Sequence, residues 1–73
     1  MKLSDMKEED VCILKDIHDS YFESRARAMG LVKGSILHVV RNQKKMPVLI
    51  YTRDTLIAVH REEAKKMEVE YES

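Results

Sequence analysis

Short stretches in which apolar and polar residues alternate, the two-residue period of a β-strand, recur along most of the chain. Residues 67–71 show this alternation most cleanly, and we expect Met67, Val69 and Tyr71 to face a core. The apolar run at residues 11–17 is rich in β-branched side chains, which also favours a strand. The pattern predicts five strands, at residues 11–17, 35–41, 48–52, 55–60 and 67–71.

A single helix is predicted between the first two strands, at residues 20–29. Ser20 and Glu23 have the spacing of a capping box, in which each side chain accepts a hydrogen bond from the other residue's amide. Gly30 stands where a left-handed residue ends many helices. Three apolar residues lie at helical spacing on one face, which we expect to pack on the core: Phe22, Ala26 and Met29.

Turn-forming residues separate the remaining elements. Gly34 opens the second strand, and Pro47, which cannot donate to a sheet ladder, closes the polar loop at residues 42–47. Arg53 and Asp54 predict the tight turn of a hairpin. Residues 61–66 are polar and favour helix, so we expect one short helical turn before the last strand.

These elements predict an all-β fold with one inserted helix. Seventy-three residues suffice for one core, so residues 1–73 are interpreted as a single domain. Five short strands would leave exposed edges unless the sheet closes on itself. The predicted architecture is therefore a small five-stranded barrel, with the helix between strands 1 and 2 and the helical turn before strand 5.

The composition is that of a folded chain: 44% of the residues are hydrophobic and the formal net charge is zero. No apolar run approaches the roughly 20 residues of a membrane span, and the first residues lack a signal-peptide pattern. One cysteine cannot form an internal disulfide, which is unusual for a small secreted domain. We therefore expect a cytoplasmic protein that does not insert into the membrane.

Charge is distributed unevenly along the sequence. Between residues 25 and 53 there are seven basic residues and no acidic one, whereas the segments on either side are acidic. A basic middle could form a surface for an anionic partner. Alternatively, the acidic ends fold back and pair with it. The sequence alone leaves both readings open, and we weight the second more heavily.

Several segments, in order along nearly the whole chain, resemble the FeoA family of bacterial ferrous iron uptake. They are Leu-Ser-Asp-Met at residues 3–6, Met-Gly-Leu-Val-Lys-Gly at 29–34, Val-Val-Arg at 39–41, Pro-Val-Leu-Ile at 47–50 and the segments 57–64 and 67–70. The segment 29–34 is the most specific of them. The loop at residues 42–47 departs from the family pattern toward basic residues, and Glu8-Glu9 replaces a Pro-Gly pair.

The resemblance implies an SH3-like β-barrel. It also implies that this barrel interacts with the cytoplasmic part of the membrane GTPase-permease FeoB. It is compatible with weak binding of a transition metal, Fe²⁺ or Zn²⁺, but implies no required cofactor. We expect a monomer or a weak homodimer.

Motifs for catalysis are missing from the sequence. It has no glycine-rich phosphate loop, no nucleophile elbow, no Cys-x-x-Cys and no His-Glu-x-x-His, so we expect a non-enzymatic protein. We do not expect a nucleic-acid partner, because the chain has few aromatic residues to stack on bases and no net positive charge. The alternative to the FeoA reading is a metal-responsive or nucleic-acid-associated SH3-like module.

Four residues are the candidate metal ligands, although no pair of them has the spacing of a zinc finger or of one helical turn. Cys12 falls within a strand and is more often a core residue than a ligand. His38 and His60 alternate with core positions, so we expect both to point into solvent. The candidates are Cys12, His18, His38 and His60, and none is assigned as a defined site.

The function predicted from the sequence is an accessory protein of ferrous iron uptake that binds and modulates the FeoB-like transporter. If the helix and the loop at residues 42–47 lie on one side of the molecule, the exposed cations of the helix, the segment 29–34 and this loop form one basic patch. The predicted contact residues are Arg25, Arg27, Met29, Gly30, Leu31, Lys33, Lys44 and Lys45. The predicted structural residues are Ser20, Glu23, Gly30, Gly34 and Pro47.

Overall fold

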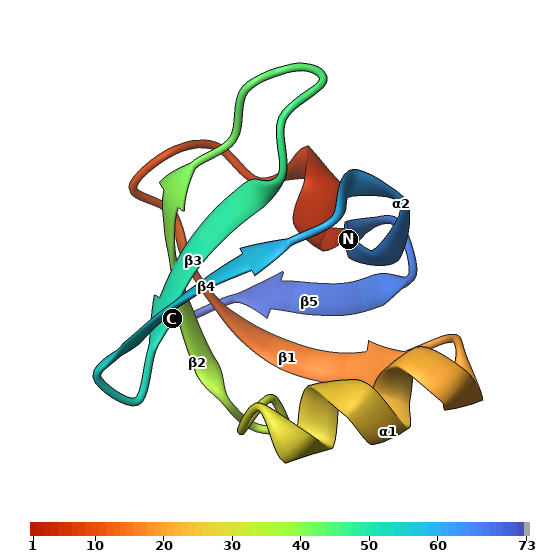
Figure 1. Ribbon diagram of the computed structural model, residues 1–73. Coiled ribbons are helices and arrows are strands. Elements are labelled where there is room, and N and C mark those ends of the chain that lie inside the picture. Colours follow the sequence, from red (N-terminus) through yellow and green to blue (C-terminus); the bar gives the residue numbers. More distant parts are fainter. Residues whose placement is uncertain (73) are drawn as a thin grey trace.

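The computed structural model describes residues 1–72 and contains one five-stranded antiparallel sheet with the strand order β4-β3-β2-β1-β5 (Figure 1). The elements in chain order are η1 (Leu3–Asp5), β1 (Val11–Ile17), α1 (Ser20–Ala28), β2 (Ile36–Arg41), β3 (Val48–Thr52), β4 (Thr55–Val59), α2 (Arg61–Ala64) and β5 (Met67–Tyr71). The five predicted strands, the inserted helix and the helical turn before the last strand are confirmed. No helix within residues 1–72 is long and apolar enough to cross a membrane.

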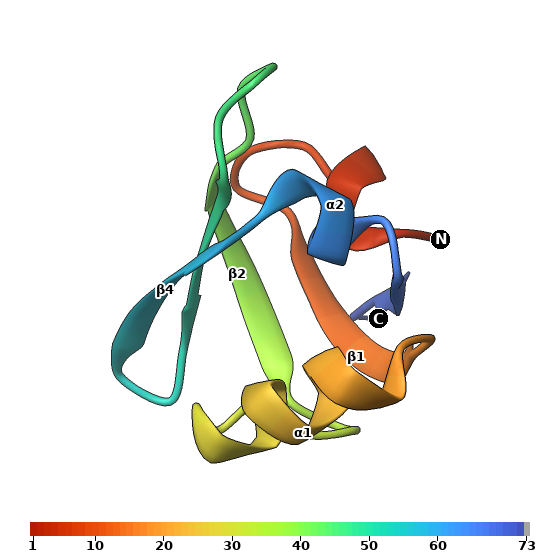
Figure 2. The same cartoon turned by 45° about the vertical axis from the view of Figure 1, so that its right-hand side comes forward.

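The sheet curls but does not close. Within residues 1–72 the two edge strands, β4 and β5, share no ladder, so the prediction of a fully closed barrel is wrong in this detail. Short segments cover the open ends instead, with α1 at one end and η1 and α2 at the other (Figure 2). Each contributes buried side chains to the core, among them Leu3 from η1, Phe22 from α1 and Ala64 from α2.

Helix α1 begins one residue earlier than the predicted capping box. Asp19 is the N-cap, and its Oδ1 accepts a hydrogen bond from the Phe22 amide at 3.0 Å. The Glu23 amide donates to the Asp19 carbonyl, so Ser20 is the first helical residue and caps nothing. The prediction of a Ser20–Glu23 capping box is therefore wrong. Both Asp19 and Ser20 are good N-cap residues, and in the structure the Asp19 carboxylate is the group that accepts from the helix.

The end of α1 agrees with the predicted role of Gly30. The Leu31 amide donates to the Ala26 carbonyl at 2.8 Å and the Gly30 amide to the Arg27 carbonyl at 3.0 Å, which is a Schellman motif. Gly30 has φ +95°, as this motif requires. Gly34, at φ +93°, turns the chain again just before β2, and its amide donates to the Leu14 carbonyl. Residues 29–34, here called the elbow, thus return the chain from the helix to the sheet.

Two apolar residues do not lie where their periodicity placed them. Phe22 and Ala26 are buried as predicted, but Met29 is exposed, because it is the C-cap and the Schellman turn places Leu31 in the core instead. Tyr71 is exposed although Met67 and Val69 are buried. It closes β5, at the end of the strand where the alternation no longer implies a core.

A hub of hydrogen bonds holds the β2–β3 loop against the rest of the molecule. The Arg61 guanidinium donates to Asn42 Oδ1, to the Gln43 carbonyl at 2.7 Å and to the Met46 carbonyl at 3.2 Å. The Asn42 amide group in turn donates to the Ser4 carbonyl at 3.1 Å and to the Met6 carbonyl. Three segments distant in sequence therefore meet at one pair of side chains. Pro47 ends this loop directly before β3, as predicted.

Substituting Gly30 tests the elbow. A Cβ atom at this position would meet no atom within 4 Å, so the cost of Gly30→Ala arises from the left-handed backbone alone. We expect Gly30→Ala to lower the free energy of unfolding by about 1–2 kcal/mol, and Gly30→Asn by less, because asparagine tolerates this region better. Urea denaturation measures both. Equal stability of all three proteins would contradict the assigned conformation.

The N-cap makes a second test, with Ser20→Ala as the control. We expect Asp19→Ala to lower the melting temperature by several degrees and Ser20→Ala to change it little. The Lys66 ammonium at 2.9 Å and the Phe22 amide hold the pKa of the Asp19 carboxyl below its usual range. Because the folded-state pKa is depressed, this stabilisation is complete above the ordinary aspartate pKa and is lost as the pH falls through the folded-state value.

Thermal scans from pH 7 to pH 2 should therefore show the wild-type and Asp19→Ala curves converging at the acid end. A constant difference between them across this range would show that the carboxylate charge has no part in capping.

Candidate functional site

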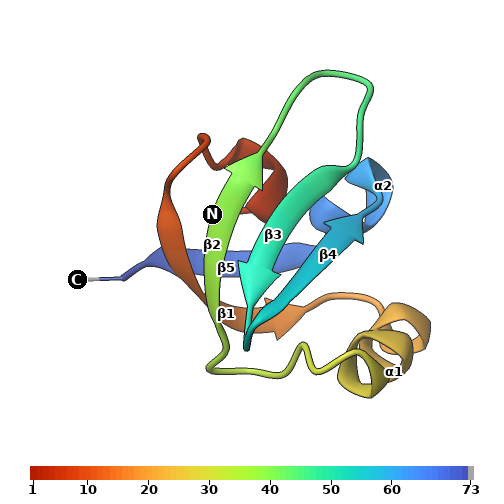
Figure 3. The same ribbon diagram turned by 60° about the vertical axis from the view of Figure 1, so that its left-hand side comes forward.

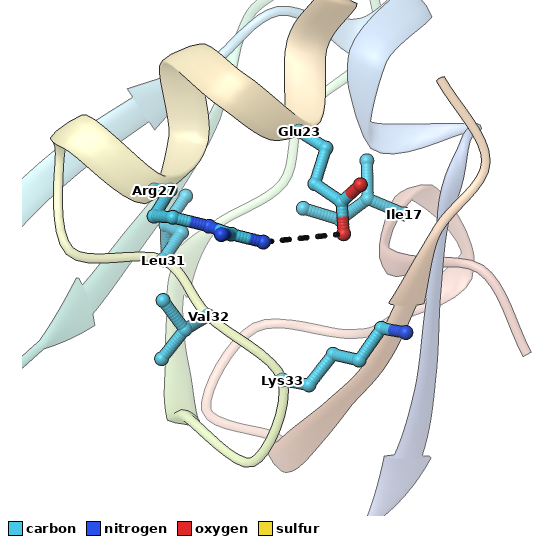
Figure 4. Close-up of a pocket in the computed structure, with 6 residues that line it drawn as sticks. All are labelled: Ile17, Glu23, Arg27, Leu31, Val32 and Lys33. Atoms are coloured by element: carbon cyan, nitrogen blue, oxygen red, sulfur yellow. Dashed lines mark ion pairs between the residues drawn. The ribbon is translucent and has the colours of Figure 1, made fainter. Parts of the chain in front are cut away.

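A cleft of about 390 Å³ opens beside α1, and we refer to it as the helix-end cleft. The last residue of β1, two residues of α1 and three of the elbow form its walls (Figure 4). Ile17, Leu31 and Val32 make it apolar, and charged side chains stand around it. Its lining residues are Ile17, Glu23, Arg27, Leu31, Val32 and Lys33. It is the place where the structure brings several of the predicted contact residues together.

The cations around this cleft are already paired with carboxylates. Arg27 lies 4.0 Å from Glu23, and Lys33 lies 3.5 Å from Asp16. Arg25 pairs with Glu63 at 3.0 Å and also stands 5.8 Å from the centre of the Tyr21 ring. The guanidinium groups of both arginines reach solvent, as predicted. For Arg25 and Lys33 the structure supports the second reading of the basic middle, in which acidic segments fold back and pair with it, whereas Arg27 pairs within its own helix.

The condition for a single basic patch, that the helix and the loop at residues 42–47 lie on one side, is not met. Lys44 and Lys45 lie in the β2–β3 loop, at the opposite end of the molecule from α1 in every view (Figures 1 and 3). Leu31 is part of the core and reaches the surface only as part of the cleft wall. The surface at the helix end is therefore reduced to the exposed residues of the predicted set, which are Arg25, Arg27, Met29 and Lys33, and to the backbone at Gly30. Sequence reasoning could not place the loop, because tertiary hydrogen bonds to Arg61 decide its position.

Cys12 does not have the character of a metal ligand. Its side chain is fully buried within β1. Burial and, to a lesser extent, the Asp10 carboxylate raise the pKa of its thiol to about 11. The thiolate form that metals require is therefore disfavoured at neutral pH. Cys12 serves as a small core residue.

His18 has carboxylates on two sides, but they do not converge on one point. Its Nδ1 lies 3.8 Å from Asp16 Oδ2, and its Nε2 lies 4.0 Å from Glu68 Oε1. A metal ion binds one ring nitrogen, so the two carboxylates face opposite sides of the ring and cannot complete one coordination sphere with it. Glu68 also binds the amino group of Met1, which lowers the pKa of its carboxyl group.

The other two histidines, His38 and His60, point into solvent as predicted. Within residues 1–72 no three histidine, cysteine, aspartate or glutamate side chains are grouped to hold a metal ion. The residues present therefore do not fit a chelated iron or zinc ion within one chain.

The FeoA-domain family model matches residues 1–71. The chain belongs to the FeoA family. This family is linked to ferrous iron transport and consists of small SH3-like accessory and regulatory domains. No curated protein matches the sequence.

Solved structures of FeoA proteins share the fold. A FeoA protein from Chlorobium tepidum is 27% identical, with a TM-score of 0.90 over 100% of this chain and 71% of the other. Iron(II) transport protein A from Clostridium thermocellum is 25% identical, with a TM-score of 0.88 over 97% of this chain and 45% of the other. FeoA of Stenotrophomonas maltophilia, crystallised with zinc and described as an SH3 domain protein, is 25% identical, with a TM-score of 0.80 over 96% and 89% of the two chains.

The predicted SH3-like fold is thus confirmed for this FeoA protein. Arg27, Leu31 and Lys33, which the sequence predicted as partner contacts, line the cleft, and the contact itself stays a prediction. Two apolar lining residues, Ile17 and Val32, were not among the predicted ones. Ile17 is the last residue of a strand, and Val32 lies between two turns. Neither position carries a periodic signal from which exposure to a cleft could be predicted.

Zinc binding provides a direct test of the ligand geometry. We expect isothermal titration of the monomeric protein with Zn²⁺ to show no stoichiometric binding at submicromolar concentration, because no donor set converges on one point. His18→Ala should leave any weak binding nearly unchanged. Tight binding at one ion per chain that His18→Ala abolishes would contradict this account of the site.

Proposed function

We propose that this FeoA protein is a non-enzymatic, cytoplasmic accessory protein of ferrous iron uptake that binds the cytoplasmic part of a FeoB-like GTPase-permease and modulates it. The observation that carries the proposal is the family match over residues 1–71. It is supported by the similarity to Clostridium thermocellum iron(II) transport protein A, and to the Stenotrophomonas maltophilia protein suggested to be a ferrous iron transport activating factor.

The helix end is the first contact surface that we propose. Arg27 and Lys33 flank an apolar cleft, and Met29 is exposed beside them. An apolar cleft bordered by charges suits a protruding apolar side chain of a partner with carboxylates around it. The pairs of Arg27 with Glu23 and of Lys33 with Asp16 do not prevent this contact. Exposed ion pairs contribute less than about 1 kcal/mol, so partner carboxylates can replace the internal ones.

Charge reversal at the cleft tests this surface. We expect the double variant Arg27→Glu, Lys33→Glu to associate with the transporter's cytoplasmic domain about tenfold more slowly at low salt, because charge at an interface acts chiefly on association. Surface plasmon resonance measures the rate constants. The matched control is Lys7→Glu, Lys65→Glu, which makes the same change of charge on exposed residues outside the cleft.

Melting temperatures close to wild type establish that both double variants are folded. Failure of the wild-type protein to bind the domain would contradict the proposed function. Binding with equal rates for the wild type, the cleft variant and the control would contradict only the choice of the helix end as contact surface.

A further inference from the structure

The outer face of β2, β3 and β4 is unusually apolar for a surface exposed to solvent. Four large apolar side chains lie on it with substantial exposure: Ile36 at 44%, Val40 at 43%, Tyr51 at 42% and Leu56 at 56%. The opposite face of the same strands carries the core, including Leu37, Val39 and Ile50. Large apolar groups gathered on one face are typical of an interaction site, whereas scattered ones are ordinary.

The strand register makes these residues neighbours. Tyr51 is opposite Leu56 on β4 and opposite His38 on β2, so these three side chains form one row across the strands. Ile36 precedes His38 by two residues on the same face and is opposite Ile13 of β1. Tyr51 and Leu56 are thus direct cross-strand neighbours, and the four apolar side chains share one face of three neighbouring strands, with His38 among them.

A β-bulge extends this face toward the β2–β3 loop. The register shifts between Val39 and Arg41, so Val40 and Arg41 both lie opposite Leu49. Both residues are exposed, Val40 in alternation with buried Val39 and Arg41 because of the extra residue in the strand. At the other end of the strands, Thr52 Oγ1 donates to the Ile36 carbonyl at 2.8 Å and ties β3 to β2. The face is therefore carried by a hydrogen-bonded scaffold rather than by a loop.

Cations border this face, and they differ from those of the helix end in having no carboxylate partner. Within residues 1–72 the basic middle contributes three paired cations, all near α1 and the elbow. Its other four form no ion pair in the described part of the chain, and they are Arg41, Lys44, Lys45 and Arg53. They lie at the end of β2, in the β2–β3 loop and in the β3–β4 turn, which flank the apolar residues at both ends (Figure 3). The Asp54 carboxylate also lies in this turn and accepts a hydrogen bond from the Tyr51 hydroxyl at 3.1 Å.

We propose that this outer face is a second docking surface, and that its occupant is a surface of the transporter's cytoplasmic part on which apolar side chains are surrounded by carboxylates. This inference rests on the proposed function and adds a footprint distinct from the helix-end cleft. The apolar side chains at the centre of the face supply the buried contact. The four unpaired cations around them favour a partner surface that carries carboxylates at its rim.

Two other occupants fit the face less well. A second copy packed face to face would bring the unpaired cations of both copies together, and like charges across an interface oppose binding. Single-stranded nucleic acid would need aromatic side chains on which bases stack, but three of the four apolar residues are aliphatic. An acidic protein surface satisfies both the charge and the apolar centre.

The experiment measures the affinity of the transporter's purified cytoplasmic domain for variants of this face. Val40→Thr, Leu56→Thr removes apolar area while keeping residues that favour strands. We expect at least a tenfold loss of affinity. The control is Tyr71→Thr, because Tyr71 is as exposed, at 52%, but lies on β5 away from the face. In a separate variant, Arg41→Gln, Arg53→Gln, the association rate should depend less steeply on salt.

The outcomes separate the two proposals. Binding by the wild type with no loss in the face variants overturns the second surface and leaves the proposed function standing. Absence of wild-type binding overturns both. Sedimentation showing a dimer that Val40→Thr, Leu56→Thr dissociates, or fluorescence anisotropy showing an oligonucleotide that this variant releases, would assign the face to another occupant and also overturn the inference.

Discussion

An open sheet that must still enclose a core is the constraint on which the rest of this structure depends. The edge strands β4 and β5 share no ladder within residues 1–72, and a chain of this length has little additional material with which to cover the gap. Segments outside the sheet supply the missing walls, through Leu3 of η1, Phe22 of α1, Leu31 of the elbow and Ala64 of α2. The caps of α1 at Asp19 and Gly30 are therefore part of core closure, since they fix where Phe22 and Leu31 enter it.

The same closure decides which charges remain available at the surface. Covering one end with α1 brings Arg25 to Glu63, while the helix and elbow place Arg27 and Lys33 beside carboxylates. At the other end, Arg61 engages carbonyl groups of the β2–β3 loop and fixes that loop away from α1. The basic middle of the sequence is thereby divided into a neutralised half and an unpaired half. This division, rather than the number of cations, favours the outer face of β2–β4 as a place for an acidic partner.

Local pattern predicted the strands, the inserted helix and the elbow well, because each depends on neighbours in sequence. Gly30 could be assigned to a left-handed turn since the Schellman motif is local. The N-cap was misplaced by one residue because Asp19 and Ser20 are equally suited to it. The contact surface could not be predicted, because the separation of Lys44 from Arg27 depends on tertiary hydrogen bonds to Arg61. The apolar outer face could not be predicted for a similar reason, since strand register alone brings its residues to one side of the sheet.

We propose that this FeoA protein acts by docking, through surfaces at the helix end and on the outer face of the sheet. The most direct measurement is a titration of ¹⁵N-labelled protein with the unlabelled cytoplasmic domain of the FeoB-like transporter, followed by two-dimensional NMR. We predict that amide signals broaden or shift in α1, the elbow and the outer-face strands β2–β4, while those of β5 change little. Changes confined to β5 and the first ten residues, or no change at saturating concentration of the domain, would contradict the account.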